Sequence, residues 1–436
     1  MVSADFAPSS LPSAQRIRFL ARHLPEFGWE PVLITTDSRY YESAVDGENE
    51  LLVPECLTVI RTPAIATHLA RKFGIGDIGM RSLYHHWKEC CRLCSTQNVD
   101  LIFITVPPYV PMVLGRLLHR RFGIPYVIDY QDPWVTDYYW RLPRSQRPPK
   151  WPLSYALSRI LEPFALRQAA GLVGVSQGTT DGVTERYGSS RSIPTAEIPL
   201  GGEPADFEYL AAHPRTQGIF DKGDGLCHVS YVGACIPPMY PAVRAIFAAV
   251  RSGLDRAPAL FSRLRLHFVG SSYAPPGVRT EAKVAALAHA AGISEFVDEQ
   301  PARVSYLDSL QLLVDSNALL LIGSEEPHYT ASKVFPYILS GRPILAVFHE
   351  DSSIIDILKN SGPARVVTFG RGAHPASQIE VISQHLEQVL TSPHSGTPRI
   401  RSVDCGGYTT RAMSARLAAL FDTVIQPSHV SQEALV

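Results

Sequence analysis

The chain has 436 residues, 45% hydrophobic and 19% charged, which is ordinary for a soluble globular protein of about two domains. Its formal net charge of -1 argues against a nucleic-acid partner, because such binding depends on an excess of basic residues. Seven unevenly spread cysteines suit a reducing compartment better than a disulfide framework. No apolar run is long enough to span a membrane, and residues 1–10 have no signal-like pattern, so we expect a cytoplasmic protein.

Short apolar segments alternate with amphipathic ones along the chain, which is typical of a doubly wound α/β fold. In the first half the pattern predicts strands at residues 31–35, 101–106, 126–130 and 171–175. It predicts helices at residues 14–24, 79–94, 110–122 and 153–170. In the second half we expect strands at 227–232, 264–269, 318–322, 343–348 and 364–368, with helices at 241–252, 280–291 and 306–315.

Residues 198–225 are rich in Gly, Pro and Asp and have little periodicity, so we place a linker there. The expected organisation is an N-terminal Rossmann-like domain at 1–197, this linker, and a second Rossmann-like domain at 226–405. Residues 406–436 would form a closing amphipathic helix at 409–424 and a frayed tail.

The segment at residues 319–348 carries the clearest functional signal. It reads as a buried strand, a polar loop, a short helix opening near Ser332 and Lys333, a stop at Gly341 and a second buried strand. Free N–H groups at a helix start favour a phosphate, and the Lys333 ammonium adds a positive charge. The pattern is typical of an enzyme that binds a nucleotide diphosphate, although the glycines of a Walker A loop are absent.

Several stretches together resemble the GT-B glycosyltransferases, and particularly the family-4 nucleotide-sugar transferases. The sequence PSSLPSAQRIRFLARHLPEFGWEPVLITTD resembles the opening of that family, and DLIFITVPPYVPMVLGRLLHRRFGIPYVIDYQDPW its acceptor-side loop and strand pair. LEPFALRQAAGLVGVSQG, SYVGACIPP, LHFVGSS and TASKVFPYILSGRPILAV resemble later parts of the fold. The resemblance implies two Rossmann-like domains that face a central cleft.

The sequence departs from the family where the donor ribose is usually held. Two glutamates are common there, and here His328 and Pro336 occupy those positions. A proline near a helix start is tolerated, but it cannot accept a hydrogen bond from a hydroxyl. Ribose recognition must then come from elsewhere, for example Glu325 or Glu326. The resemblance implies these donor-binding residues: Gly233, Arg303, Glu326, Tyr329, Thr330, Ser332 and Lys333.

On the acceptor side, Asp129 and Asp132 close a predicted strand, and His328 lies upstream of the anion-binding helix. We take these three as the catalytic candidates, since a carboxylate there can orient or deprotonate an acceptor hydroxyl. The alternative is that both aspartates only cap turns. The resemblance implies an acceptor site formed by Ser10, Ser13, Gln15, Pro108, Tyr109, Gln131 and Trp134.

Two other patterns invite a functional interpretation. His86, Cys90 and Cys94 repeat at four-residue spacing, but a third ligand at i+8 lies too far along a helix for one zinc ion, so we expect core packing and no metal. Residues 136–153 interleave aromatic residues with four basic ones, which suits an acceptor lid, a peripheral contact at the inner membrane face, or a plain solvated loop.

We therefore predict a metal-independent, cytoplasmic GT-B glycosyltransferase that moves a sugar from a nucleotide diphosphate to an acceptor hydroxyl, with retention if the family likeness holds. The nucleotide-sugar is a co-substrate, and no other cofactor is expected. One alternative is a GT-B enzyme that couples a sugar-like donor without a glycosidic bond. Another is a catalytically degenerate partner or scaffold, which the loss of the ribose glutamate favours.

Overall fold

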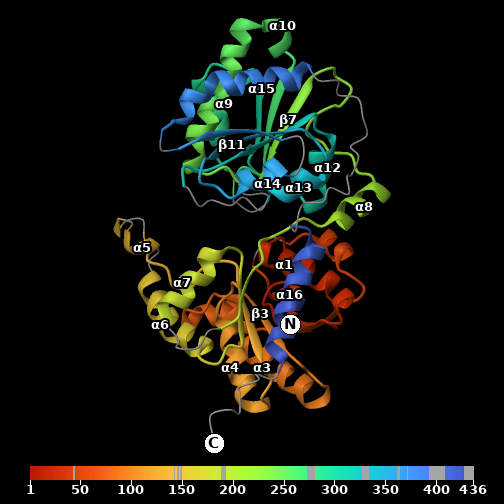
Figure 1. Ribbon diagram of the computed structural model, residues 1–436, viewed down its shortest axis with the longest axis vertical. Coiled ribbons are helices and arrows are strands. Elements are labelled where there is room, and N and C mark those ends of the chain that lie inside the picture. The colour runs from red at the N-terminus through yellow and green to blue at the C-terminus, as the bar shows by residue number, and fades with distance from the viewer. Residues whose placement is uncertain are drawn as a thin grey trace, which may run out of the picture. The chain divides into compact units, whose positions relative to one another are not determined.

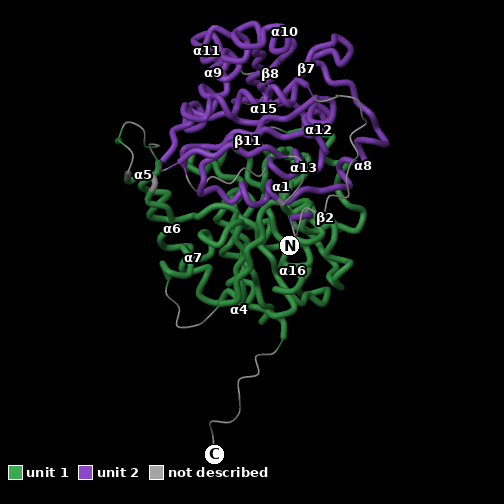
Figure 2. The backbone as a smooth tube through the Cα atoms, turned by 45° about the horizontal axis from the view of Figure 1, so that its top comes forward, with its two compact units in different colours: residues 1–200, 410–436 green, residues 201–409 purple. Residues whose placement is uncertain are grey.

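The computed structural model describes residues 1–436 except 43–44, 142, 145–146, 148–149, 188–192, 273–279, 327–332, 361–363, 371, 392–407 and 427–436. The described chain divides into two compact units, which Figure 2 shows in separate colours. Unit 1 contains residues 1–200 and 410–436, and unit 2 contains residues 201–409. Each unit is built around a parallel sheet.

The sheet of unit 1 consists of two groups of strands joined by a single residue. One group pairs β1 (Val32–Thr36) with β2 (Thr58–Thr62), and the other has the order β3 (Ile102–Val106), β4 (Tyr126–Tyr130), β5 (Gly171–Gly174), β6 (Thr195–Glu197). Val2 forms parallel bridges to both Ile34 of β1 and Ile104 of β3. With Val2 in the first-strand position, the order is that of a doubly wound nucleotide-binding fold.

The main helices of unit 1 cover this sheet. They are α1 (Pro12–His23), α3 (Ile78–Thr96), α4 (Val113–Phe122), α6 (Trp151–Leu166), α7 (Gln177–Tyr187) and α16 (Thr410–Ile425), with single turns at α2 (Thr67–Ala70) and α5 (Tyr138–Arg141). The apolar side chains of α3 and α4 pack against one face of the sheet, in a cluster with Ile104 and Ile128. The buried side chains of α1 pack against the other face of the sheet, in a cluster with Phe103 and Val127.

The closing helix α16 belongs to unit 1, although the chain reaches it only after passing through unit 2. It lies beside α1, as Figure 1 shows, and the Ser414 hydroxyl donates a hydrogen bond of 2.8 Å to the Leu20 carbonyl of α1. Leu417 is fully buried among the side chains of α1 and the sheet. The separate C-terminal part expected at 406–436 is therefore a layer of the first domain, because its apolar stripe completes the core there.

The sheet of unit 2 has six parallel strands. Their order is β12 (Ala364–Phe369), β11 (Ile344–His349), β10 (Ala318–Ile322), β7 (Cys227–Val232), β8 (Leu264–Val269), β9 (Val297–Gln300). Every residue of β10 is buried, as expected for a central parallel strand covered on both faces. The order is again doubly wound, and it reverses direction between β7 and β10.

Helices cover both faces of this sheet. In Figure 1, α9 and α15 lie on one side of β11, and α13 and α14 lie on the other. The helices of unit 2 are α8 (Pro204–Ala212), α9 (Tyr240–Arg256), α10 (Pro258–Phe261), α11 (Lys283–Ala290), α12 (Tyr306–Asp315), α13 (Val334–Leu339), α14 (Ile354–Asn360) and α15 (Ile379–Thr391).

The expected linker at 198–225 contains helix α8, and from residue 201 it belongs to unit 2. The prolines and acidic residues that suggested a linker start this helix instead. Pro204 occupies its first turn, and the Glu203 side chain accepts a hydrogen bond from the Ala205 N–H. Tyr306 of α12 donates a 2.8 Å hydrogen bond to Asp206, which fastens α8 to the rest of the unit.

Candidate functional site

The crevice of unit 2 lies where the strand order reverses. Chains leave the neighbouring strands β7 and β10 toward opposite faces there, and ligands of doubly wound folds bind outside the carboxyl ends of such strands. Gly233 follows β7, and the segment after β10 leads through Lys333 into α13. The topology therefore brings Gly233 and Lys333 to one edge of the sheet.

Lys333 reaches across this edge to the loop after β7. Its Nζ donates a hydrogen bond of 2.6 Å to the Tyr231 hydroxyl, lies 3.4 Å from the Ala234 carbonyl oxygen and sits 4.2 Å from the Tyr231 ring centroid. Helix α13 is fixed to the same strand, because the Tyr337 hydroxyl accepts a 2.7 Å hydrogen bond from the Val232 N–H. The ammonium is thus held by Tyr231 and Ala234, and the helix that follows Lys333 is held by Val232.

The charge of Lys333 is costly in this position. Burial lowers the pKa of Lys333 from 10.5 to about 8, and the nearby Cys235 opposes the shift. Among the ion pairs of the described residues, none joins Lys333 to a carboxylate. A desolvated cation without an anionic partner favours an anionic ligand such as a diphosphate.

Two glycines leave the backbone beside Lys333 open. Gly233 has φ of +121°, and a Cβ built there would lie 3.0 Å from Lys333 Nζ, so a side chain would intrude on the ammonium. Gly270, which follows β8, lies close to both Gly233 and Arg303. The half-buried Arg303, in the loop after β9, is therefore at the same edge. The structure brings together Gly233, Arg303 and Lys333 of the predicted donor residues.

The remaining donor predictions have other outcomes. His328, Tyr329, Thr330 and Ser332 lie outside the described residues. Glu326 and its neighbour Glu325 are solvent-exposed. Helix α13 begins at Val334, and Gly341 follows its end with φ of +69°, as the sequence predicted for the stop. The described helix has six residues, so the Lys333 side chain is the feature that marks this edge for an anion.

In unit 1, the structure holds Asp129 inside a closed network. Its carboxylate accepts two hydrogen bonds from Arg16 of α1, at 2.6 and 2.7 Å, and one of 2.8 Å from the Thr105 hydroxyl. Asp129 and Arg16 are both fully buried, and Gln131 donates a 3.3 Å hydrogen bond to Thr105. With these partners, Asp129 positions the loop after β4 and has no surface for an acceptor.

Asp132 is the better placed of the two predicted aspartates. It is exposed, and desolvation by its surroundings raises the pKa of its carboxyl group. Tyr109 stacks on Trp134 with ring centroids 5.3 Å apart, and its hydroxyl lies 3.3 Å from the Asp132 and Pro133 carbonyl oxygens. Asp132, Tyr109 and Trp134 therefore share one loop cluster at the carboxyl edge of the sheet.

The other predicted acceptor residues are more dispersed. Ser13 is buried, and Ser10 and Pro108 are half-buried. Gln15 accepts hydrogen bonds of 2.9 and 2.6 Å from Arg18, which orients its amide along α1. Gln131 joins the Asp129 network through Thr105.

Sequence reasoning missed Asp5. It lies three residues after Val2, just beyond the first-strand position and so at the switch point of unit 1. Asp5 is 4% exposed, and burial, followed by the nearby Asp77, raises its pKa to about 6. A buried carboxyl group with a raised pKa, just beyond the first-strand position, is a candidate for proton transfer. The signal available in the sequence was an aspartate in the short segment that precedes the first helix.

The structure buries His86 and Cys90 of α3 in unit 1. His86 is fully buried and lies 3.2 Å from the Thr36 hydroxyl, and burial lowers its pKa to about 4. Cys90 packs in the sheet core. No group of three metal-binding side chains is found among the described residues.

Comparison with known proteins places this arrangement in a fold class. The chain is similar to E. coli trehalose-6-phosphate synthase bound with UDP-2-fluoro glucose, at 11% identity with a TM-score of 0.58, over 98% of each chain. The Burkholderia vietnamiensis UDP-forming trehalose-phosphate synthase is 12% identical with a TM-score of 0.58, over 99% of this chain and 98% of that one. Anabaena HepE in complex with UDP and glucose is 12% identical with a TM-score of 0.51, over 98% of this chain and 96% of that one. No curated protein matches the sequence itself.

The chain therefore has the GT-B fold of glycosyltransferases, and the predicted fold class is confirmed. More particularly, residues 13–201 match the family described as the glycosyl transferase 4-like domain. This match and the fold support the predicted glycosyltransferase class.

Proposed function

We propose that this protein is a glycosyltransferase whose unit 2 binds the diphosphate of a nucleotide-sugar through Lys333. The observation that carries the proposal is the desolvated Lys333 ammonium at the switch point, which Tyr231 holds and which makes no ion pair with a carboxylate of the described residues. The fold supports it, since the structural neighbours include proteins crystallised with UDP or a UDP-sugar.

In this proposal Lys333 acts on the leaving group. Breaking the bond between the sugar and the diphosphate leaves negative charge on the diphosphate, and a fixed cation stabilises that charge more than it stabilises the intact donor. Gly233 and Gly270 leave room for the phosphates to approach the backbone. Arg303 is at the same edge and supplies a second charge.

The acceptor would be held by unit 1, in the loop cluster of Asp132, Tyr109 and Trp134. We assign the acceptor hydroxyl to Asp132 or Asp5, because Asp129 is already engaged by Arg16. Retention at the anomeric carbon belongs to the same proposal. It is tested by assigning the anomeric proton coupling of the product by NMR.

The first test is calorimetric titration with UDP, GDP, dTDP and ADP. We expect one nucleotide to bind at micromolar concentration, and Lys333→Ala to weaken that binding by about 1.5–3 kcal/mol, as for a charge-assisted contact. The matched control is Lys359→Ala, because Lys359 is an exposed lysine of the same unit. Absence of binding by all four nucleotides would overturn the proposal in favour of a scaffold.

Binding alone does not separate ordinary transfer from the coupling of a sugar-like donor without a glycosidic bond. Mass spectrometry of products formed from the UDP-sugar or its equivalent separates the two. A product that glycosidases cleave supports glycosyl transfer, and a resistant product supports the alternative.

We also propose that transfer needs no divalent metal. The charge of Lys333 at the diphosphate edge supports this, since it takes the part that a metal ion takes elsewhere. Activity is then expected to survive EDTA undiminished. Loss of activity that Mg²⁺ or Mn²⁺ restores would contradict it.

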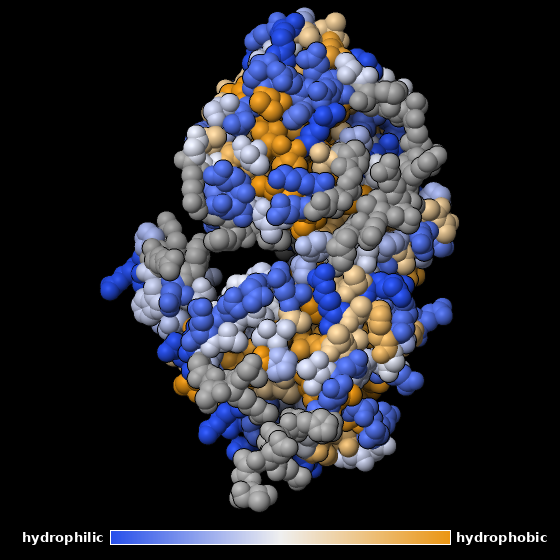
Figure 3. All heavy atoms as spheres, in the orientation of Figure 1, coloured by the Kyte–Doolittle hydropathy of each residue, from blue (hydrophilic) through white to orange (hydrophobic). Residues whose placement is uncertain are grey.

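A contact with the inner face of the membrane is a further part of the proposal. None of the described helices is both long and apolar enough to cross a bilayer. On unit 1, Trp140, Leu153 and Ile160 are 51%, 74% and 67% exposed, whereas the face seen in Figure 3 is largely a mixture of hydrophilic and hydrophobic residues. Co-sedimentation with anionic vesicles, lost in Leu153→Ser, would support this contact.

A further inference from the structure

The short helix α13 places Lys333, and it is too short to hold its own position. It has six residues, and Lys333 directly precedes its first one. Isolated helices of this length are unstable in water, so contacts with the rest of unit 2 must fix where α13 lies. The same contacts therefore decide where the Lys333 ammonium lies.

These contacts reach α13 from opposite sides. On one side, the Tyr337 hydroxyl accepts a 2.7 Å hydrogen bond from the Val232 N–H of β7. Phe335 and Leu339 are four residues apart and share another face, about 200° around the helix axis from Tyr337. Phe335 and Leu339 are each 1% exposed, so that face is also covered.

The segments that cover this second face are the first and last residues of unit 2. The chain enters unit 2 at Gly201 and leaves it after Thr409. Gly202 and Thr409 form a parallel bridge, and the Gly202 N–H donates a 3.2 Å hydrogen bond to the Tyr408 carbonyl oxygen. The two passages of the chain between the units therefore run side by side.

Both passages pack on α13. The Tyr408 ring stacks on the Phe335 ring, with centroids 5.5 Å apart and planes inclined by 27°. A Cβ built at Gly202 would lie 2.6 Å from Leu339 Cδ1 and 3.1 Å from Phe335 Cβ. Side-chain atoms do not approach to 2.6 Å unless a neighbour moves, so this contact requires glycine.

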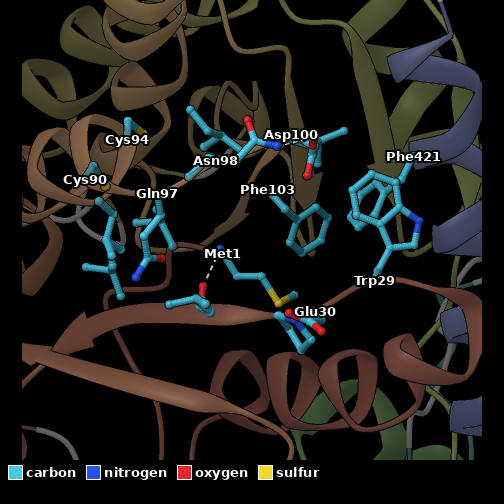
Figure 4. Close-up of a pocket in the computed structure, with 18 of the residues that line it drawn as sticks. Met1, Trp29, Glu30, Cys90, Cys94, Gln97, Asn98, Asp100, Phe103 and Phe421 are labelled. Carbon is cyan, nitrogen blue, oxygen red and sulfur yellow. Dashed lines mark hydrogen bonds between the residues drawn. The ribbon is translucent and has the colours of Figure 1, made fainter.

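The segment that carries Tyr408 is also fixed on its other side. It continues directly into α16, which begins at Thr410. In unit 1, the Phe421 ring of α16 packs edge-on against Trp29, with centroids 5.0 Å apart, as Figure 4 shows. Tyr408 therefore lies between a ring of α13 and the start of a well-packed helix.

We propose that Tyr408 and Gly202 are positioning residues, which act through α13 to hold Lys333 at the proposed donor site. The inference rests on the proposed function, since Lys333 is the diphosphate-binding residue there. Neither positioning residue touches the donor. Functional groups must be held within about 0.5 Å of the productive geometry, so a small shift of α13 weakens the contact between Lys333 and the diphosphate.

The first test measures nucleotide affinity by calorimetry in Tyr408→Ala, Tyr408→Phe and Tyr209→Ala. Tyr209 of α8 is the matched control, because its ring also stacks within unit 2, on that of His213. We expect Tyr408→Ala to raise Kd about three- to tenfold, as for a lost aromatic pair. Tyr408→Phe keeps the stacked ring, so it and the control should leave Kd unchanged. Unchanged affinity in Tyr408→Ala would overturn the proposal.

A double variant then shows whether Tyr408 acts through Lys333. In the Lys333→Ala background, Tyr408→Ala should have no further effect on Kd, because the charge that it positions is absent. A general loosening of unit 2 would instead weaken binding equally in both backgrounds. Equal losses in the two backgrounds would therefore overturn the proposal.

Gly202→Ala tests the second contact and does not depend on how well Tyr408→Ala folds. The added methyl group should displace Leu339 and raise Kd, and the loss in Gly202→Ala with Leu339→Ala should be smaller than the two single losses combined. Gly218→Ala is the matched control, because a Cβ built there meets nothing within 4 Å. Fully additive losses, or an equal loss in the control, would contradict the role of Gly202.

A last measurement needs no nucleotide, so it separates failure of this inference from failure of the proposed function. NMR titration of ¹³C-labelled lysine side chains gives the Lys333 pKa, and Lys333→Met assigns the signal. Water should reach the ammonium when α13 loosens, so Tyr408→Ala should raise this pKa from about 8 toward 10.5, and Tyr408→Phe should not. An unchanged Lys333 pKa in Tyr408→Ala would overturn the inference. A raised pKa in a protein that binds no nucleotide would support the positioning and overturn the donor role.

Discussion

The buried charge of Lys333 has a cost in the stability of unit 2. Its pKa of about 8 in the folded protein lies below the ordinary value of 10.5, so the unfolded chain binds more protons between these limits. Stability of unit 2 should therefore rise as pH increases through that window. We expect Lys333→Met to raise the free energy of unfolding at pH 7 by about 1–3 kcal/mol. This range is kept low because the Lys333 side chain is only partly buried and solvent screens its charge.

Chemical denaturation at pH 7 and pH 10 measures this effect. The gain in Lys333→Met should shrink at the higher pH, and Lys359→Met should show no gain at either. Nucleotide affinity of the unmodified protein should fall as pH rises through 8, because the neutral amine attracts a diphosphate less. An affinity that stays flat up to pH 10 would remove Lys333 from the donor site.

For Asp5 we expect the opposite pH dependence, a stability of unit 1 that falls as pH rises. Its pKa of about 6 is raised above the ordinary 3.8, so the folded protein binds more protons between these limits and loses stability as pH rises through them. Asp5→Asn should stabilise unit 1 at pH 7 by about 1–3 kcal/mol, with the gain vanishing below pH 4. If Asp5 accepts the acceptor proton, the variant also loses activity and the acidic limb of the pH–rate profile near 6. Unchanged activity would leave Asp132 as the candidate.

At the scale of elements, α16 shows how a distant segment completes a core. Leu417 is fully buried against α1 and the unit 1 sheet. Leu417→Ala should destabilise unit 1 by about 2–5 kcal/mol, through lost burial and the cavity left behind. Differential scanning calorimetry should show only the unit 1 transition moving, and Thr423→Ala, on the exposed side of the helix, should move neither. A shift of the unit 2 transition instead would contradict the assignment of α16.

The central strands could be predicted because their signal is local. β4, β7, β8 and β10 appear at the predicted bounds, since buried parallel strands are continuous apolar runs. Three edge strands were missed: β2, β6 and β9. β2 is partly exposed, β6 is only three residues long, and β9 (Val297–Gln300) contains two acidic residues. None of the three has the continuous apolar run of a buried strand.

At the scale of the whole molecule, the two units should respond separately to a donor nucleotide. At a concentration of 100 times Kd, mass action stabilises the unit that binds by about 2.7 kcal/mol. Hydrogen exchange should show protection after β7, after β8 and in α13, because Gly233, Gly270 and Lys333 lie at that edge. The sheet of unit 1 should exchange unchanged. Protection confined to unit 1 would place the nucleotide in the wrong unit for our proposal.

The sequence by itself determined the GT-B class, the central strands and the pairing of Lys333 with a short helix that stops at Gly341, because each depends on residues near one another in the chain. The tertiary structure decided what depends on distant residues. Only folding brings Arg16 to Asp129, so only the structure shows that this carboxylate is occupied. In the same way, Val2 takes the first-strand position, with Asp5 just beyond it, only because Ile34 and Ile104 lie on either side. Periodicity records which side of an element is apolar, and it carries no information about which partner covers that side.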